Sequence, residues 1–271
     1  MSDDTSGDAW PTSVGLVGSG AMGRAMLAGL VRGRPSLGAA CVVADAIPEA
    51  ARAGAQEVGG TVGTVAQATA CTLVLLAVKP KDAEACLREV AAASGPGTVV
   101  LSVVAGWDLA RFRAHLPAGV GVVRTMPNLA VRLGAGIVAM ATDGVDELAM
   151  AGMRALLAPL GTVVELPESL FGAATALAGS GPGLLALVAE ALEEGGVSSG
   201  LTRPQARALA QGAMAGTAAL LAGGEDPAAL RQRVSSPAGT TVAGLSVLER
   251  GAVRAHIADA VVAAARRAAE L

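Results

Sequence analysis

A glycine-rich hexapeptide near the start of the chain constrains its fold more than any other feature. It follows the apolar run Val14 to Val17 and precedes the helix-like segment Arg24 to Val31. A strand, a glycine turn and a helix N-terminus in this order form a pyrophosphate site, because the glycines allow a tight turn and a close approach of phosphate to the backbone. The hexapeptide predicts a dinucleotide-binding loop, which consists of Gly18, Ser19, Gly20, Ala21, Met22 and Gly23.

The residues after the loop favour this interpretation over an ordinary glycine turn, which is the alternative in a chain with 36 glycines. A second apolar run, Cys41 to Ala44, ends in Asp45. An acidic residue at the end of the second strand accepts hydrogen bonds from an adenosine ribose. The order of strand, helix, strand and acid therefore predicts a bound dinucleotide.

Length and composition exclude several other classes of protein. The chain has 271 residues, of which 52% are hydrophobic, so it can bury a sizeable core in two domains. Its net charge of -3 provides no basic surface for a nucleic acid backbone, and its 1% of aromatic residues provide no platform for stacked bases. We therefore expect a small-molecule ligand and no nucleic acid partner.

The cysteines and the N-terminal segment indicate the cellular compartment of the protein. Cys41, Cys71 and Cys86 lack the spacing of metal ligands and lie in or beside apolar or helical runs, so we expect buried thiols, no metal site and a reducing cytoplasm. The segment Met1 to Asp8 is acidic and polar, unlike an export signal. We expect residues 1–11 to form a disordered tail.

Short runs rich in valine and leucine alternate with helix-like segments over residues 12–167. This alternation predicts an α/β domain with a doubly wound parallel sheet. Helices are expected between the strands, for example Ala21 to Val31 and Lys81 to Ala93. The predicted strands are Ser13 to Val17, Ala40 to Ala44, Leu73 to Val78, Thr98 to Val103, Val120 to Arg124, Gly136 to Ala141 and Thr162 to Glu165.

Residues 168–271 consist of alanine- and leucine-rich helical segments without strand-like runs, which predicts an all-α second domain. Thr202 with Gln205 has the spacing of a capping box, and Asp226 precedes Pro227 at a helix start. The apolar stretch Ala173 to Leu192 is interrupted by glycines and Glu190, which favours a buried helix over a membrane span. Wide apolar faces on the helices Gly212 to Leu221 and Val253 to Ala269 predict contacts with another copy.

Ligand-binding residues in such sheets lie in loops at the carboxyl ends of strands. One predicted strand ends at Val78, Lys79 and Pro80, and Lys79 is one of two lysines in the chain. Another ends shortly before Asn128, which can bind a carboxamide or hydroxyl. A solvated lysine and a simple Pro-Asn turn remain the alternatives at these two places.

The residue types that the chain lacks limit the reactions that it can catalyse. Reduction of a carbonyl by hydride needs an acid, usually His, Tyr or Lys. The chain has no tyrosine and no lysine after Lys81, and its two histidines, His115 and His256, lie away from the strand ends, where we expect packing or surface roles. A protonated imine avoids this requirement, because it is already electrophilic and needs only orientation and hydrogen-bond donors.

The segment Val234 to Thr241 can supply such donors. Val242, Leu245 and Leu248 follow it with helical spacing, so Gly239 to Thr241 lie at a helix start. Free N–H groups and the positive end of the helix dipole favour a carboxylate there. A serine- and threonine-capped helix without a ligand is the alternative.

Five motifs in this order resemble the pyrroline-5-carboxylate reductase family, and together they cover nearly all of the chain from Val14 onward. The last motif is specific when Gly195 to Val197 and Gly200-Leu201 precede it; the others are not specific alone. The motifs are Gly18 to Gly23, Ala77-Val78-Lys79-Pro80, Met126-Pro127-Asn128, Gly179 to Pro182, and Ser235 to Thr241.

The resemblance implies the reduction of 1-pyrroline-5-carboxylate to L-proline by NAD(P)H. It implies an N-terminal Rossmann-type domain and a C-terminal helical dimerisation domain, hence a homodimer or larger homo-oligomer. By similarity, Thr241 hydrogen-bonds the ring nitrogen, and Ser236 with the amides of Gly239, Thr240 and Thr241 holds the substrate carboxylate. Ala77, Val78, Lys79, Pro80 and Asn128 belong to the cofactor side, with Lys79, Pro80 and Asn128 at the nicotinamide end.

The chain departs from the family pattern at a few positions. Gly183-Leu184 replaces the usual Ala-Tyr, Ala178 a serine and Ala238 a glycine, so a related cyclic imino acid is an alternative substrate. Asp45 stands where many relatives place small polar or basic residues; because an acid repels a 2′-phosphate, it predicts a preference for NADH.

Two other classes of protein share this plan. A hydroxyacid dehydrogenase relies on a lysine in the interdomain helix, and the segment Ser180 to Gly195 contains none. A non-catalytic nucleotide-binding protein with the same fold is the second alternative.

Overall fold

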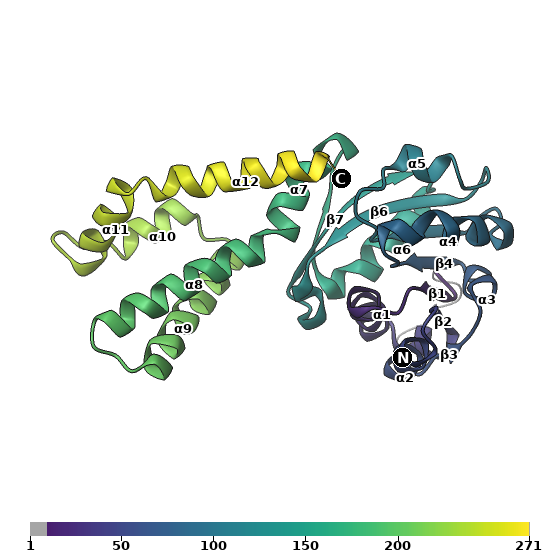
Figure 1. Cartoon of the computed structure of the whole chain (residues 1–271), viewed down its shortest axis with the longest axis horizontal. Helices are drawn as coiled ribbons and strands as arrows, with labels where there is room; N and C mark the ends of the chain where they lie inside the picture. The colour runs from purple at the N-terminus through teal and green to yellow at the C-terminus, as the bar shows by residue number, and fades with distance from the viewer. Residues whose placement is uncertain (1–9, 271) are drawn as a thin grey trace, which may run out of the picture. The chain divides into compact units, whose positions relative to one another are not determined.

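The computed structural model describes residues 10–270, which form eight strands and twelve α-helices (Figure 1). The described residues divide into two compact units. Unit 1 comprises residues up to Gly179 together with residues 264–270, and unit 2 comprises Ser180–Ala263. The strands all lie in unit 1, which confirms the prediction of an α/β fold followed by a helical region.

A single sheet organises unit 1, in the order β3-β2-β1-β4-β5-β6-β7-β8. Its inner strands are fully buried runs of apolar residues, as expected for a sheet covered on both faces. The strands are β1 (Val14–Val17), β2 (Cys41–Ala44), β3 (Thr61–Val62), β4 (Leu73–Leu76), β5 (Val99–Ser102), β6 (Gly121–Pro127), β7 (Gly136–Asp143) and β8 (Gly161–Glu165).

The predicted parallel sheet carries one antiparallel pair near its edge. β6 and β7 pair antiparallel, with Arg124 opposite Ala141, and β7 and β8 are parallel to each other. The link between β6 and β7 holds only the 3-10 helix η2 (Leu129–Leu133), which is too short for the crossover that a parallel pair needs. β7 and β8 therefore run opposite to the other six strands.

Some strand limits also differ from the prediction. β6 continues to Pro127 and β7 to Asp143, because the two strands extend each other's hydrogen-bond ladder. β4 ends at Leu76, two residues early, where the chain turns toward α4 (Pro80–Ala93). The exposed, two-residue strand β3 has no apolar pattern, and the sequence did not indicate it.

Helices cover both faces of the sheet. On one face, α1 (Ala21–Gly33), α2 (Pro48–Val58) and α6 (Glu147–Leu157) contribute Leu30, Ala55 and Met153, respectively, to one buried cluster. On the other face, α3 (Val65–Thr69), α4 and α5 (Leu109–Arg113) form a second cluster that includes Leu87, Trp107 and Phe112. Trp107 and Phe112 are fully buried, with ring centroids 5.4 Å apart.

Unit 1 extends beyond the predicted domain boundary at residue 167. Glu168 forms an ion pair of 2.7 Å with Arg124 of β6, and the Arg124 guanidinium lies 4.4 Å from the Phe171 ring centroid. These contacts keep η4 (Glu168–Leu170), α7 (Phe171–Ala174) and the π-helical turn η5 (Thr175–Gly179) with the sheet.

Part of the predicted tail lies in this unit as well. The carbonyls of Trp10 and Pro11 accept hydrogen bonds from Arg34 at 3.0 and 2.9 Å, and Trp10 packs against the first cluster. These two residues are therefore an ordered part of the domain. The rest of the predicted tail lies outside the described residues.

Unit 2 is helical throughout. Its helices are α8 (Gly181–Ser198), α9 (Arg203–Ala222), α10 (Pro227–Arg233), α11 (Thr240–Arg250) and most of α12 (Val253–Ala269). The predicted caps are present: Gln205 Oε1 accepts the Thr202 N–H at 3.0 Å, and Asp226 accepts two backbone N–H groups. Glu193 of α8 binds Arg203 and Arg207 of α9 at 2.9 and 2.8 Å.

The apolar helix at the start of unit 2 is not buried in the single chain, contrary to expectation. α8 contains no buried residue, and Leu185 and Leu187 are exposed. Among residues 10–270, the stretch Glu168–Ser198 is the one helical candidate for a membrane span by length and composition, with 17% of its apolar window buried.

Candidate functional site

The glycine loop follows β1 and places α1 with its N-terminus at the carboxyl edge of the sheet. Gly18 has φ +95°, and a Cβ there would lie 2.6 Å from the Ala77 carbonyl oxygen. A Cβ on Gly23 would lie 2.3 Å from the Gly18 carbonyl oxygen, whereas one on Gly20 would meet no atom within 4 Å. Two glycines thus allow close packing, and Gly20 leaves open space before the helix, which fits the backbone of a phosphate-binding loop.

Asp45 lies directly beside this loop. Its Oδ2 accepts the Ser19 N–H at 2.6 Å and its Oδ1 accepts the Ile47 N–H at 2.8 Å. The buried Ser19 hydroxyl donates to the Ala50 carbonyl at 2.8 Å, which joins the loop to α2. Each carboxylate oxygen can accept a further hydrogen bond, so a ribose remains a possible ligand of Asp45.

The segment Ala77 to Pro80 follows β4, next to β1 in the sheet. The Ala77 N–H donates to the Val17 carbonyl at 2.8 Å, and its backbone contacts Gly18. Lys79 is the N-cap of α4, and Pro80 is the first residue of that helix. Lys79 is exposed, and the described residues give its ammonium group no hydrogen-bond or ion-pair partner.

Asn128 joins β6 to η2 and is only 7% exposed. Its Oδ1 accepts the N–H groups of Ala130 and Ile137, both at 3.2 Å. Because both donors are backbone groups, they fix the orientation of the side-chain amide. The Nδ2 donors have no partner within residues 10–270, so Asn128 can offer a hydrogen bond to an acceptor such as a carbonyl oxygen.

The serine- and threonine-rich segment of unit 2 forms a turn and a helix start, as predicted. The Gly239 N–H donates to the Ser236 carbonyl at 2.9 Å, with Pro237 and Ala238 (φ +57°) between them, which is the pattern of a type II turn. The Gly239 amide, which the resemblance assigns to the substrate, is therefore engaged in the turn. A Cβ on Gly239 would lie 2.4 Å from Ser236 Oγ, so only glycine leaves this hydroxyl in place.

α11 begins at Thr240 without a capping side chain. Within the described residues, the N–H groups of Thr240, Thr241 and Val242 have no acceptor, and the first bond of the helix joins the Ala243 N–H to the Gly239 carbonyl. Three free donors and the helix dipole favour an anion at this helix start. Thr241 is partly exposed, and Thr240 and Ser236 are exposed.

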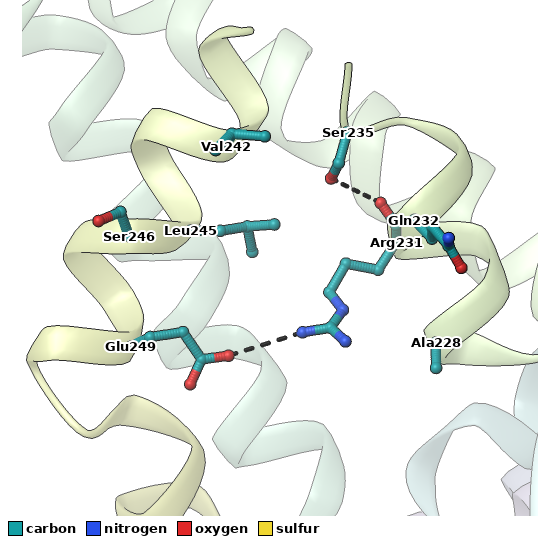
Figure 2. Close-up of a pocket in the computed structure, with 8 residues that line it drawn as sticks. All are labelled: Ala228, Arg231, Gln232, Ser235, Val242, Leu245, Ser246 and Glu249. Carbon is teal, nitrogen blue, oxygen red and sulfur yellow. Dashed lines mark hydrogen bonds and ion pairs between the residues drawn. The ribbon is translucent and has the colours of Figure 1, made fainter. Parts of the chain in front are cut away.

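A pocket of about 430 Å³ lies between α10 and α11 (Figure 2). It contains Ser235, whose hydroxyl donates to the Arg231 carbonyl, and Arg231 approaches Glu249 to 3.6 Å. The predicted residues Ser236, Gly239, Thr240 and Thr241 do not line it. The pocket therefore adjoins the predicted substrate segment without including it.

The histidines and cysteines have structural surroundings. His115 packs beside Trp107 and its Nδ1 lies 2.8 Å from the Arg111 carbonyl, while His256 is exposed on α12. Burial raises the pKa of the Cys41 thiol to about 12 and also raises the pKa of Cys71 and Cys86. Such thiols stay protonated and unreactive. No group of three metal-binding side chains occurs in residues 10–270.

The parallel core of the sheet, the glycine loop at its carboxyl edge and the separate helical unit define a two-domain nicotinamide-dinucleotide oxidoreductase. Residues 13–106 match the family model described as NADP oxidoreductase coenzyme F420-dependent, and residues 168–271 match pyrroline-5-carboxylate reductase dimerisation. The chain belongs to the pyrroline-5-carboxylate reductase family.

Individual relatives agree along nearly the whole chain. The chain is 38% identical over 284 residues to pyrroline-5-carboxylate reductase of Mycobacterium tuberculosis, with 95% of this chain and 96% of the relative covered. It is 41% identical over 263 residues to that of Thermus thermophilus, with 94% and 97% covered. A solved pyrroline-5-carboxylate reductase from Coxiella burnetii superposes with a TM-score of 0.90 at 27% identity, covering 96% and 98%.

One residue beside the loop was missed by the sequence interpretation. Arg24 follows Gly23 directly, and its Nε is buried without a hydrogen-bond partner. A charged residue immediately after the third glycine was the available signal, but it was read as part of an ordinary helix.

Proposed function

We propose that this protein reduces the cyclic imine 1-pyrroline-5-carboxylate to L-proline with NAD(P)H, as the last step of proline biosynthesis. The observation that carries the proposal is the uncapped start of α11 beside Ser236, in a chain of this family that lacks a histidine, tyrosine or lysine suited to protonate an alkoxide. When bound, the reduced nicotinamide supplies the hydride. The chain's residues bind, orient and hydrogen-bond a substrate whose imine nitrogen is already protonated.

The residues proposed to bind the cofactor belong to unit 1. Gly18, Ser19, Gly20, Ala21, Met22 and Gly23 supply the loop over which the pyrophosphate lies, because Gly20 leaves space and α1 directs free N–H groups toward it. Ala77, Val78, Lys79 and Pro80 form the neighbouring wall. The Nδ2 donors of Asn128 bind the carboxamide oxygen, since its Oδ1 is engaged by the backbone.

The residues proposed to bind the substrate belong to unit 2. The Ser236 hydroxyl and the amides of Thr240 and Thr241 hold the substrate carboxylate, and the Val242 amide adds a third helix donor. Gly239 contributes by having no side chain, since a Cβ would displace Ser236 Oγ. The Thr241 hydroxyl hydrogen-bonds the ring nitrogen, which fixes the position of the reacting C=N bond.

The role of Thr241 can be tested with a neighbouring threonine as control. Thr241→Ala removes the hydroxyl and is expected to lower kcat by roughly a hundredfold, the effect of losing one positioned donor. Thr240→Ala keeps the helix amide and should retain most activity. Steady-state kinetics with 1-pyrroline-5-carboxylate measure kcat for both variants, and the cofactor Kd shows whether cofactor binding has changed. A fully active Thr241→Ala enzyme contradicts the assignment.

NADH is the preferred cofactor in this proposal. Asp45 lies at the ribose end of the loop, and its carboxylate repels a 2′-phosphate. The nearby Arg52 is paired with Glu49 at 2.6 Å, which leaves it poorly placed to bind that phosphate. We expect kcat/KM to be higher with NADH than with NADPH.

Two variants test the preference. Asp45→Ser and Asp45→Asn remove the charge, and we expect each to shift the ratio roughly tenfold toward NADPH, about 1.4 kcal/mol. Asp45→Asn keeps one side-chain oxygen that can accept a backbone N–H from Ser19 or Ile47. Comparison with Asp45→Ser therefore separates loss of the charge from loss of these backbone contacts. A wild-type preference for NADPH would overturn this part of the proposal.

The proposal places the enzyme in the cytoplasm as a homodimer or larger homo-oligomer, without a nucleic acid or membrane partner. The exposed apolar faces of unit 2 belong to the region that matches the dimerisation model. A panel of cyclic imino acids tests the substrate, because Ala238 and the Gly183-Leu184 pair could favour a related ring. Absence of cofactor oxidation with every member of the panel would contradict an enzymatic role.

A further inference from the structure

A second pocket of about 430 Å³ lies on unit 1 beside the glycine loop. One of its walls is a face of α1 that begins at Ala21, the first residue of the helix and a member of the loop. Helices α2 and η2 supply the remainder. The lining residues are Ala21, Arg24, Ala25, Ala28, Glu57, Leu129 and Arg132.

Arg24 has an unsatisfied donor in this pocket. Its Nε is one of two buried side-chain polar atoms without a hydrogen-bond partner in the described part of the chain, and its guanidinium has no ion pair there. The stem of Arg24 is held in place, because its Cγ packs near Gly54 of α2, where Ser19 Oγ also lies. A buried N–H donor without an acceptor costs free energy, and an anion recovers it only where the Arg24 side chain turns to present this donor.

The other charges of the pocket are Arg132 and Glu57. Neither side chain has a hydrogen bond or ion pair among residues 10–270, and neither lies within ion-pair distance of Arg24. The three groups give the pocket a net charge of +1. The two free guanidinium groups match the hydrogen-bond geometry of a phosphate.

We propose that Arg24, assisted by Arg132, binds the pyrophosphate of the dinucleotide. The pocket continues from Ala21 at the N-terminus of α1, the end of the helix that favours phosphate, and does not include Asp45. The assignment rests on the proposed cofactor site. Because NADH and NADPH share the pyrophosphate, Arg24 contributes equally to both, whereas Asp45 discriminates between them.

The experiment measures Kd for NADH and for NADPH on the full-length protein. Arg24→Gln should raise both constants by roughly tenfold, as expected for one charge-assisted hydrogen bond, and Arg132→Gln should raise both by less. Glu57→Gln should lower both, because it removes the opposing charge. Arg88→Gln, which removes an exposed charge from the opposite face of the sheet, should leave both unchanged.

Three results would overturn the proposal. If Arg24→Gln raises Kd for NADPH alone, Arg24 contacts the 2′-phosphate and not the pyrophosphate. Unchanged constants for both cofactors in a folded Arg24→Gln protein would show that Arg24 binds neither phosphate. Equal effects of Arg24→Gln and Arg88→Gln would indicate only long-range charge. If the wild type binds neither cofactor, the proposed cofactor site itself has failed, which is a distinguishable outcome.

Discussion

The two units of this chain bury their apolar residues to very different extents. Unit 1 closes a core on each face of its sheet, with Leu30 and Leu75 fully buried in one cluster and Leu76 in the other. In unit 2, α8 and α11 contain no buried residue, and α9 buries only Ala206 and Ala210. Unit 1 has the core of an independent domain, whereas unit 2 has half of one, and a second copy supplies the rest.

The largest expected effect tests this contrast directly. Leu30→Ala in α1 should destabilise the protein by about 2–5 kcal/mol, because it leaves a cavity in a closed core. Leu187→Ala in α8, at a side chain 64% exposed in the chain, should also lower the melting temperature if α8 packs against a second copy. Leu133→Ala, at a residue 83% exposed in unit 1, should change little.

Protein concentration distinguishes the two kinds of core. The melting temperature of the wild type should rise with protein concentration, and the Leu187→Ala protein should show a larger monomer fraction by sedimentation. The Leu30→Ala loss should persist at all concentrations. If Leu187→Ala behaves like Leu133→Ala, the apolar face of α8 is not an interface.

A smaller effect is expected at the junction between the sheet and the segment after β8. The Arg124 and Glu168 side chains are 14% and 28% exposed, and Glu168 also accepts the Leu109 N–H at 2.7 Å. Arg124→Ala leaves this carboxylate without its partner, and we expect a loss of about 2 kcal/mol after allowing for partial exposure. Denaturant unfolding measures it. Arg154→Ala, which breaks the more exposed pair with Glu165, should cost under about 1 kcal/mol.

A still smaller change is expected at the turn before α11. Ala238 adopts φ +57°, a conformation that glycine adopts more easily, so Ala238→Gly should stabilise the protein by about 0.5–1 kcal/mol. Ala252, at φ +52° before α12, is the matched control. Both replacements should raise the melting temperature, and only Ala238→Gly should alter KM for the imine. An equal KM change in both proteins would contradict a link between this turn and the substrate.

The smallest effect concerns the ionic contact between α8 and α9. Hydrogen bonds from Arg207 and Arg203 lower the pKa of Glu193 below its ordinary value of 4.5. The contact therefore stabilises the folded state above about pH 4.5 and is lost as the pH falls through the lowered pKa. The stability difference between wild type and Glu193→Gln should shrink below pH 4 in acid-titrated unfolding curves. A stability difference between the two proteins that stays constant down to pH 2 would contradict a stabilising contact of ionised Glu193.

Local sequence patterns predicted much of the fold. The buried runs of β1, β4 and β5, the glycine loop and the capped helices lie where hydrophobic runs and capping residues placed them. The strand β7 was predicted but its antiparallel direction was not, because its residues are as apolar as those of a parallel strand and only the short link through η2 reverses it. Unit 1 continues to Gly179, and one of its contacts beyond residue 167 is the Arg124 to Glu168 pair, which joins residues 44 positions apart.

The interactions of the site residues were harder to predict from the sequence than the fold was. Motifs indicated Asp45, Gly239 and Asn128, but they could not show that backbone groups already occupy both oxygens of Asp45, the amide of Gly239 and the oxygen of Asn128. Arg24 becomes notable only when its Nε is seen to lack an acceptor. These properties depend on neighbours distant in sequence, so a linear pattern does not contain them.

The amide of Asn128 separates folding from recognition within one side chain. Its oxygen accepts two backbone N–H groups at the connection between two strands that run in opposite directions, and its nitrogen has no hydrogen-bond partner among residues 10–270. Since the carbonyl half is locked, the group cannot flip to present an acceptor. A ligand that binds Asn128 as proposed must therefore supply a hydrogen-bond acceptor.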